Sequence, residues 1–132
     1  MTFPTTRKKK RQQPENDACR TWLQWLKLQH PEVFEHVIKI DNEGTTNRAN
    51  AVSLGLHPGA SDYFIAYPTP MFHGLFIEAK PDNWKLTKSK QQHYDRQMLF
   101  GEKMRQNGYA FSFCIGVDEM IKATRDYLEC FT

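Results

Sequence analysis

The sequence has little that would indicate a disulfide framework, a membrane protein or a secreted one. Its 132 residues include three cysteines, Cys19, Cys114 and Cys130, an odd number whose spacing fits no metal-ligand pattern. No apolar run approaches the ~20 residues of a membrane helix, and the polar, basic N-terminus lacks the apolar stretch of a secretory signal. We therefore expect reduced, buried thiols in a cytoplasmic protein.

Acidic residues are also missing from the start of the chain, since none occurs before Glu15. Five basic residues stand there: Arg7, Lys8, Lys9, Lys10 and Arg11. Because the net charge is +3, the rest of the chain is slightly acidic. We expect residues 1–13 to form a disordered basic arm in which Lys8, Lys9 and Lys10 contact DNA phosphates. A solvated tail or a nuclear import signal would have the same composition.

Residues 14–132 are predicted to form one α/β domain. Apolar periodicity and turn residues predict helices over about 16–29, 47–54, 89–107 and 117–128, and strands over about 36–40, 62–67, 74–80 and 109–115. His30-Pro31 is expected to end the first helix and Gly108 the long third one.

The chemistry-bearing residues cluster at the end of one predicted strand. In Leu75-Phe76-Ile77-Glu78-Ala79-Lys80, alternation places Glu78 and Lys80 on one face and Ala79 on the other. A solvated strand end with an ion pair would explain this pattern alone.

Asp62 strengthens the case for a catalytic site. If the two middle strands form a hairpin centred on Pro70, Asp62 stands opposite Glu78, with Cβ atoms about 5 Å apart. Two carboxylates so close repel each other unless a cation lies between them, and Mg²⁺ or Mn²⁺ prefers such oxygen ligands. The ion would polarise a phosphate and activate water, and Lys80 could orient that water or neutralise the transition state. Gly59, just before Asp62, lets the backbone approach closely.

These motifs resemble a known nuclease family. Gly59-Ala60-Ser61-Asp62, then a strand, then Gly74 to Lys80, is similar to the G-x-P-D…(D/E)-x-K signature of the PD-(D/E)XK nucleases, and most similar to their VRR-NUC branch. The resemblance covers about residues 15–128. Ser61 departs from it, because the family usually has proline there.

The resemblance implies a restriction-endonuclease-like core, in which a mixed β-sheet is flanked by helices, and further site residues. The metal would be bound by Asp62, Glu78 and Ala79. A glutamate on the first helix is matched by Glu15, with Glu43 as the competing candidate. A glutamine on the helix after E-x-K is matched by Gln97, which we favour, or by Gln91.

A basic segment beyond the site adds three candidates for DNA binding: Lys85, Lys88 and Lys90, with Trp84 nearby. Such a segment could bind backbone phosphates or stack a base, and an ordinary solvated loop would look the same.

The leading hypothesis is a Mg²⁺- or Mn²⁺-dependent endodeoxyribonuclease. As the resemblance implies, its substrate would be branched or structured DNA such as Holliday junctions, and the protein would be a homodimer of phage or bacterial type acting in repair or recombination. The alternative is a catalytically inactive DNA-binding or interaction module on the same fold.

Overall fold

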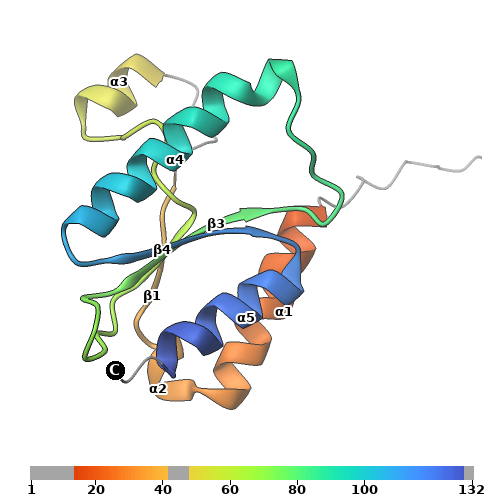
Figure 1. Cartoon of the computed structure of the whole chain (residues 1–132), viewed down its shortest axis with the longest axis vertical. Coiled ribbons are helices and arrows are strands. Elements are labelled where there is room, and N and C mark those ends of the chain that lie inside the picture. The colour runs from red at the N-terminus through yellow and green to blue at the C-terminus, as the bar shows by residue number, and fades with distance from the viewer. Residues whose placement is uncertain (1–13, 42–47, 130–132) are drawn as a thin grey trace, which may run out of the picture.

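A four-stranded sheet lies between two layers of helices in the computed structural model, which describes residues 14–41 and 48–129 (Figure 1). The elements are α1 (Pro14–Gln29), α2 (Pro31–Phe34), β1 (Val37–Lys39), α3 (Arg48–Ser53), β2 (Tyr63–Ile65), β3 (Leu75–Lys80), the 3-10 turn η1 (Lys88–Lys90), α4 (Gln91–Gln106), β4 (Ala110–Ile115) and α5 (Val117–Leu128). Figure 1 shows α1 and α5 on one side of the sheet and α4 on the other. Within the described ranges, no helix has both the length and the hydrophobicity needed to cross a membrane.

The sheet is mixed, as predicted. Its strand order is β1-β2-β3-β4; β1 pairs antiparallel with β2, β2 antiparallel with β3, and β3 parallel with β4. The parallel connection needs a crossover, which α4 supplies. In the β2–β3 pair, Tyr63 is opposite Ile77 and Phe64 is opposite Phe76. This register is the one expected for a hairpin centred on Pro70, so that prediction is confirmed.

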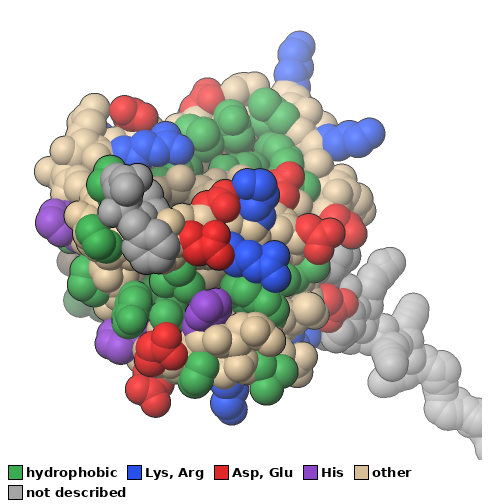
Figure 2. All heavy atoms as spheres, turned by 60° about the horizontal axis from the view of Figure 1, so that its bottom comes forward, with side chains coloured by type: hydrophobic (Ala, Val, Ile, Leu, Met, Phe, Trp, Pro, Cys, Tyr) green, Lys and Arg blue, Asp and Glu red, His purple; other side chains and the backbone are tan. Residues whose placement is uncertain are grey.

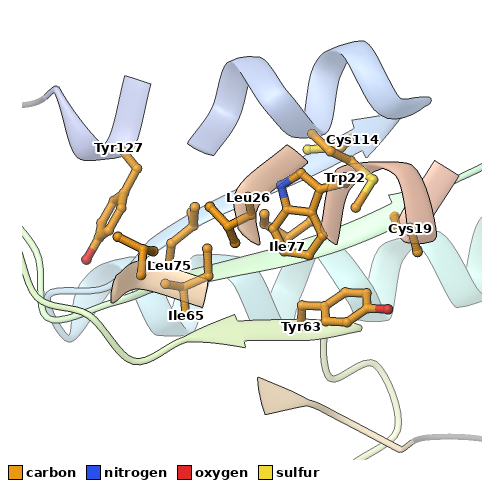
Figure 3. Packing of buried hydrophobic residues seen from close by; sticks show 12 residues of the cluster. Cys19, Trp22, Leu26, Tyr63, Ile65, Leu75, Ile77, Cys114 and Tyr127 are labelled. Carbon is orange, nitrogen blue, oxygen red and sulfur yellow. The ribbon is translucent and has the colours of Figure 1, made fainter. Parts of the chain in front are cut away.

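The main hydrophobic core lies on the side of the sheet covered by α1 and α5 (Figure 3). Trp22 and Leu26 of α1 are fully buried and belong to the same cluster as Ile65 and Ile77 of the sheet. The indole Nε1 of Trp22 donates a 2.9 Å hydrogen bond to the hydroxyl of Thr124 on α5, so a polar atom in the core has its partner. Trp22 is therefore a core residue.

Aromatic rings fill the other side of the sheet, beneath α4. The rings of Phe64 and Phe76 stack with centroids 4.4 Å apart, and Phe100 of α4 meets Phe76 edge-on at 5.3 Å. Gly101 lets α4 lie directly on the ring of Phe111, because a Cβ at position 101 would overlap that ring. The side chains of Phe76, Glu78 and Lys80 leave the sheet on this same side, so the position of α4 decides what covers them.

Two features depart from the sequence-based expectation. His30-Pro31 ends α1 as predicted, but Pro31 then starts the one-turn helix α2, since proline is well tolerated at the first helical position. The long helix begins with the 3-10 turn at Lys88, so the α-helix proper starts at Gln91. Cys19 and Cys114 are buried, as expected, whereas Cys130 lies outside the described residues.

Replacing Gly101 with alanine tests how closely α4 packs against the ring of Phe111. Helix propensity alone predicts that Gly101→Ala stabilises the fold by about 1 kcal/mol. We expect the opposite sign, a net loss of about 1–3 kcal/mol, because the new methyl group overlaps the ring of Phe111. Urea denaturation measures this difference.

A second background isolates the cause of that loss. In Phe111→Leu protein the same alanine should cost less, because the ring that it meets is gone. An equal loss in both backgrounds, or a gain in the parent, would contradict this account of the packing.

Candidate functional site

Asp62 and Glu78 stand side by side at the end of the β2–β3 pair. Each lies one residue beyond the paired Tyr63 and Ile77. The backbone of Asp62 is held between two strands, since its N–H donates to Ile77 O at 3.0 Å and its carbonyl accepts from Ile40 N at 2.8 Å. Its side-chain Oδ2 accepts the backbone N–H of Ala79 at 2.8 Å. The sheet therefore fixes both the position and the orientation of Asp62.

Glu78 is a buried acid with a strongly perturbed pKa. Its exposure is 2%, and burial raises its pKa from the ordinary 4.5 to about 9. The negative charge of Asp62 and a side-chain hydrogen bond with it add to this rise, whereas the charge of Lys80 opposes it. Lys80 Nζ lies 3.4 Å from Glu78 Oε2. The positive charge of Lys80 thus only partly offsets the rise in the pKa of Glu78 that burial and the carboxylate of Asp62 cause.

The buried side chain of Gln97 on α4 covers Glu78. Its Nε2 donates a 2.7 Å hydrogen bond to Glu78 Oε2, and its exposure is 4%. Gln91 is exposed at the start of the same helix and donates instead to Asp95. Of the two glutamines left open by the sequence, Gln97 is the one in contact with Glu78.

His93 is a neighbour of the site that the sequence did not reveal. Its Nε2 lies 3.1 Å from Nε2 of Gln97. Because an amide nitrogen donates and does not accept, this contact fits a tautomer of His93 whose Nε2 accepts the second N–H of Gln97. The i,i+4 spacing of His93 and Gln97 was the available signal, but it acquires meaning only once Gln97 is known to point at Glu78.

Two aromatic rings lie close to the amine of Lys80. Its Nζ lies 5.9 Å from the ring centroids of both Trp84 and Phe113, within the range of a cation–π contact. The amine thus contacts both rings and the buried acid. Lys80 therefore has a defined place beside Glu78, with a small solvent-exposed fraction.

The three lysines of the following segment have different environments. Lys85 and Lys88 are exposed, as a phosphate-binding role would require. Lys90 is partly buried: its Nζ donates to the carbonyl of Lys85 at 3.0 Å and lies 5.3 Å from the ring centroid of Trp84. Lys90 thus also folds this segment against Trp84.

Gly59 brings the loop before Asp62 close to α4. Its φ is +94°, and a Cβ there would lie 2.9 Å from the carbonyl oxygen of Arg96. The sequence-based inference that Gly59 permits a close backbone approach is confirmed, and the partner is the backbone of α4. Ser61, which stands where related motifs carry proline, is fully buried.

The donor atoms at this site suit a hard divalent cation. Asp62 and Glu78 supply carboxylate oxygens, and Ala79 between Glu78 and Lys80 can add only a main-chain oxygen. In the described part of the chain, Glu78 Oε1 is buried without a hydrogen-bond partner, and such an atom needs a proton or a cation. The described residues contain no group of three or more His, Cys, Asp or Glu side chains placed to hold a metal ion, so the carboxylate pair is the part of the predicted metal site that the structure describes.

Several predicted residues cannot be placed. The side chain of Glu15 and the competing Glu43 lie outside the described residues, as do Lys8, Lys9 and Lys10 of the basic arm. Their roles stay predictions.

The raised pKa of Glu78 predicts a pH dependence of stability. Between about pH 4.5 and 9 the unfolded chain carries an ionised Glu78 while the folded chain keeps it protonated, so unfolding releases a proton and is favoured as pH rises. In EDTA, the parent should therefore lose stability relative to Glu78→Gln across this window. One pKa unit corresponds to about 1.4 kcal/mol, so urea titrations at about pH 5 and pH 8 should separate the two proteins by more than about 1 kcal/mol.

Glu102→Gln is the matched control, because Glu102 is exposed and makes a 3.5 Å surface ion pair with Arg105. It should follow the parent at every pH. Parallel curves for the parent and Glu78→Gln would show that Glu78 is ionised in the folded chain without a metal.

Comparison with known proteins supports the resemblance at the level of the fold. No protein-family model matches the sequence, and no curated protein matches it. A solved structure of a VRR_NUC domain protein superposes with a TM-score of 0.72 at 21% sequence identity, covering 92% of this chain and 93% of the other. Its length and architecture match nearly end to end, although few residues are shared. The chain therefore has the fold of a VRR-NUC domain.

Proposed function

We propose that this protein is a Mg²⁺- or Mn²⁺-dependent endodeoxyribonuclease that hydrolyses phosphodiester bonds. The observation that carries the proposal is the meeting of Asp62, Glu78 and Lys80 on one side of a VRR-NUC-like sheet. A buried carboxyl group beside a second acid destabilises the fold unless a cation is present, and the core does not require this trio. A role in catalysis accounts for all three residues.

The chemistry follows from the donors at the site. Asp62, Glu78 and the carbonyl of Ala79 would hold the ion, which on binding supplies polarisation of the scissile phosphate and favours ionisation of the attacking water. Lys80 would stabilise the negative charge that develops around phosphorus. Gln97 would keep the Glu78 carboxylate oriented through its 2.7 Å hydrogen bond.

The proposed substrate is branched or structured DNA such as a Holliday junction. A homodimer would present two active sites to two strands, in a phage or bacterial cytoplasm during repair or recombination. Exposed Lys85 and Lys88, together with Lys8, Lys9 and Lys10, would bind the DNA backbone.

Removal of either an acid or the ammonium group should abolish cutting. We expect Glu78→Gln, Asp62→Asn and Lys80→Ala each to lower the rate by about 100-fold or more. The measurement is the cleavage of plasmid, single-stranded and four-way junction DNA in Mg²⁺, Mn²⁺ or EDTA. Glu102→Gln and Lys122→Ala are matched controls, because both side chains are exposed and make only surface ion pairs.

The outcomes separate the competing hypotheses. Metal-dependent cutting that is lost in the three variants and kept in the controls supports the nuclease. DNA binding without cutting in any metal would instead support the inactive module. Cutting that survives in Glu78→Gln would overturn the assignment of the site.

The two glutamines of α4 provide a second test. We expect Gln97→Ala to slow metal-dependent cleavage by about 10- to 100-fold, the usual effect of removing a hydrogen-bond partner of a metal ligand. Gln91→Ala should change it less than about threefold, because the exposed side chain of Gln91 donates to Asp95 and not to Glu78. Rates are compared at saturating metal and again at limiting metal, where the loss in Gln97→Ala should be larger. Equal effects of the two substitutions would contradict the positioning role of Gln97.

A further inference from the structure

A pocket opens beside Asp62, between α1 and the edge of the sheet. It has a volume of about 300 Å³, and Arg20 of α1, Lys39 of β1 and Asp62 all line it. Glu78, Lys80 and Gln97 do not line it. The pocket therefore adjoins the candidate catalytic residues through Asp62 without being part of their cluster.

The two cations at the pocket are available to a ligand. Within the described residues, the ion pair of Arg20 is a 3.5 Å contact with Asp17 in which both side chains are more than half exposed, and such a surface pair constrains the guanidinium weakly. Lys39 Nζ lies 5.2 Å from the ring centroid of Tyr63, which also lines the pocket. Two cations of this kind, one from a helix and one from a strand, suit the oxygens of a phosphate.

The pair of cations Arg20 and Lys39 matters because charges of both signs are mixed on other parts of the surface. Figure 2 shows acidic and basic side chains mixed across the face that it brings forward. The electrostatic attraction of such a mixed surface for a polyanion is weak over distance. Local pairs of cations next to the acids of the site are therefore needed to place a phosphate backbone in register.

The size and the apolar wall of the pocket indicate what accompanies that phosphate. A volume of about 300 Å³ is at the lower limit of small-ligand sites, which suits one nucleotide and excludes a duplex. Leu23 and Tyr63 supply apolar surface beside the cations, against which a sugar or a base edge could lie.

We propose that this pocket holds a single unpaired nucleotide next to the scissile phosphate, with Arg20 and Lys39 binding the phosphate of that nucleotide. The assignment rests on the proposed nuclease function and adds to it a preference for DNA with an unpaired nucleotide at the cut. Asp62, shared by the pocket and the catalytic cluster, places the bound nucleotide adjacent to the reacting one.

The test compares Arg20→Ala, Lys39→Ala and the double variant with the parent in binding and in cleavage. Binding is measured with fluorescent oligonucleotides in Ca²⁺ over a series of salt concentrations. For single-stranded DNA, the double variant should bind at least about tenfold more weakly, and the slope of log K against log salt should fall by about 0.7 to 1.4, the value for one or two lost phosphate contacts. KM should rise while kcat changes less than about threefold, since neither side chain would touch the reacting atoms.

Lys27→Ala is the control, because Lys27 is an exposed cation on the same helix that does not line the pocket and lies 5.8 Å from the ring centroid of Phe34. Melting temperatures confirm that all variants fold. The loss of affinity should be larger for single-stranded or gapped DNA than for a continuous duplex.

Each remaining outcome overturns a defined part of the proposal. If the parent cuts DNA and the double variant behaves like Lys27→Ala, the pocket is not a nucleotide site, although the nuclease assignment stands. Equal losses on gapped and continuous duplexes would refute the unpaired nucleotide. A parent that neither binds nor cuts any DNA would overturn both the pocket and the function.

Discussion

The register of the β2–β3 hairpin is the constraint on which the rest of the site depends. It places the carboxyl groups of Asp62 and Glu78 next to each other, one of them buried. Such a pair is unfavourable by itself, since burial and mutual repulsion both oppose ionisation. Three neighbouring groups stabilise the pair. Lys80 contributes a positive charge, Ala79 N–H donates to Asp62, and Gln97 donates to Glu78.

The main hydrophobic core and the candidate site lie on opposite faces of the sheet. On the side of α1 and α5, fully buried residues such as Trp22 and Ile77 form the main core, and the hydrogen bond from Trp22 to Thr124 joins the two helices. On the side of α4, aromatic contacts around Phe76 hold that helix, and the polar site continues along the same strand. The main core can therefore offset the cost of burying Glu78 without contributing a side chain to the site.

Much of this arrangement could be predicted because it depends on local rules. Alternation along the strand separated Glu78 and Lys80 from Ala79, and the symmetry of a hairpin about Pro70 paired Asp62 with Glu78. The sequence favoured Gln97 over Gln91 but left the choice open, because the contact with Glu78 depends on where α4 starts and how it is rotated. Those properties come from the 3-10 turn at Lys88 and from the close contact of Gly101 with the ring of Phe111. Neither feature has a recognisable sequence pattern.

The contacts of His93 and the aromatic neighbours of Lys80 were missed for the same reason. Trp84 and Phe113 are 29 residues apart in the chain, yet both rings lie 5.9 Å from one ammonium group. These contacts and the 3.4 Å approach to Glu78 Oε2 restrict the rotamers of Lys80 and favour a position of its charge beside Glu78. A mobile lysine would have to be ordered when substrate binds, at a cost in side-chain entropy. In the proposed mechanism, the rings would help to keep this cation in place before a phosphate binds, which is the preorganisation that electrostatic stabilisation of a transition state requires.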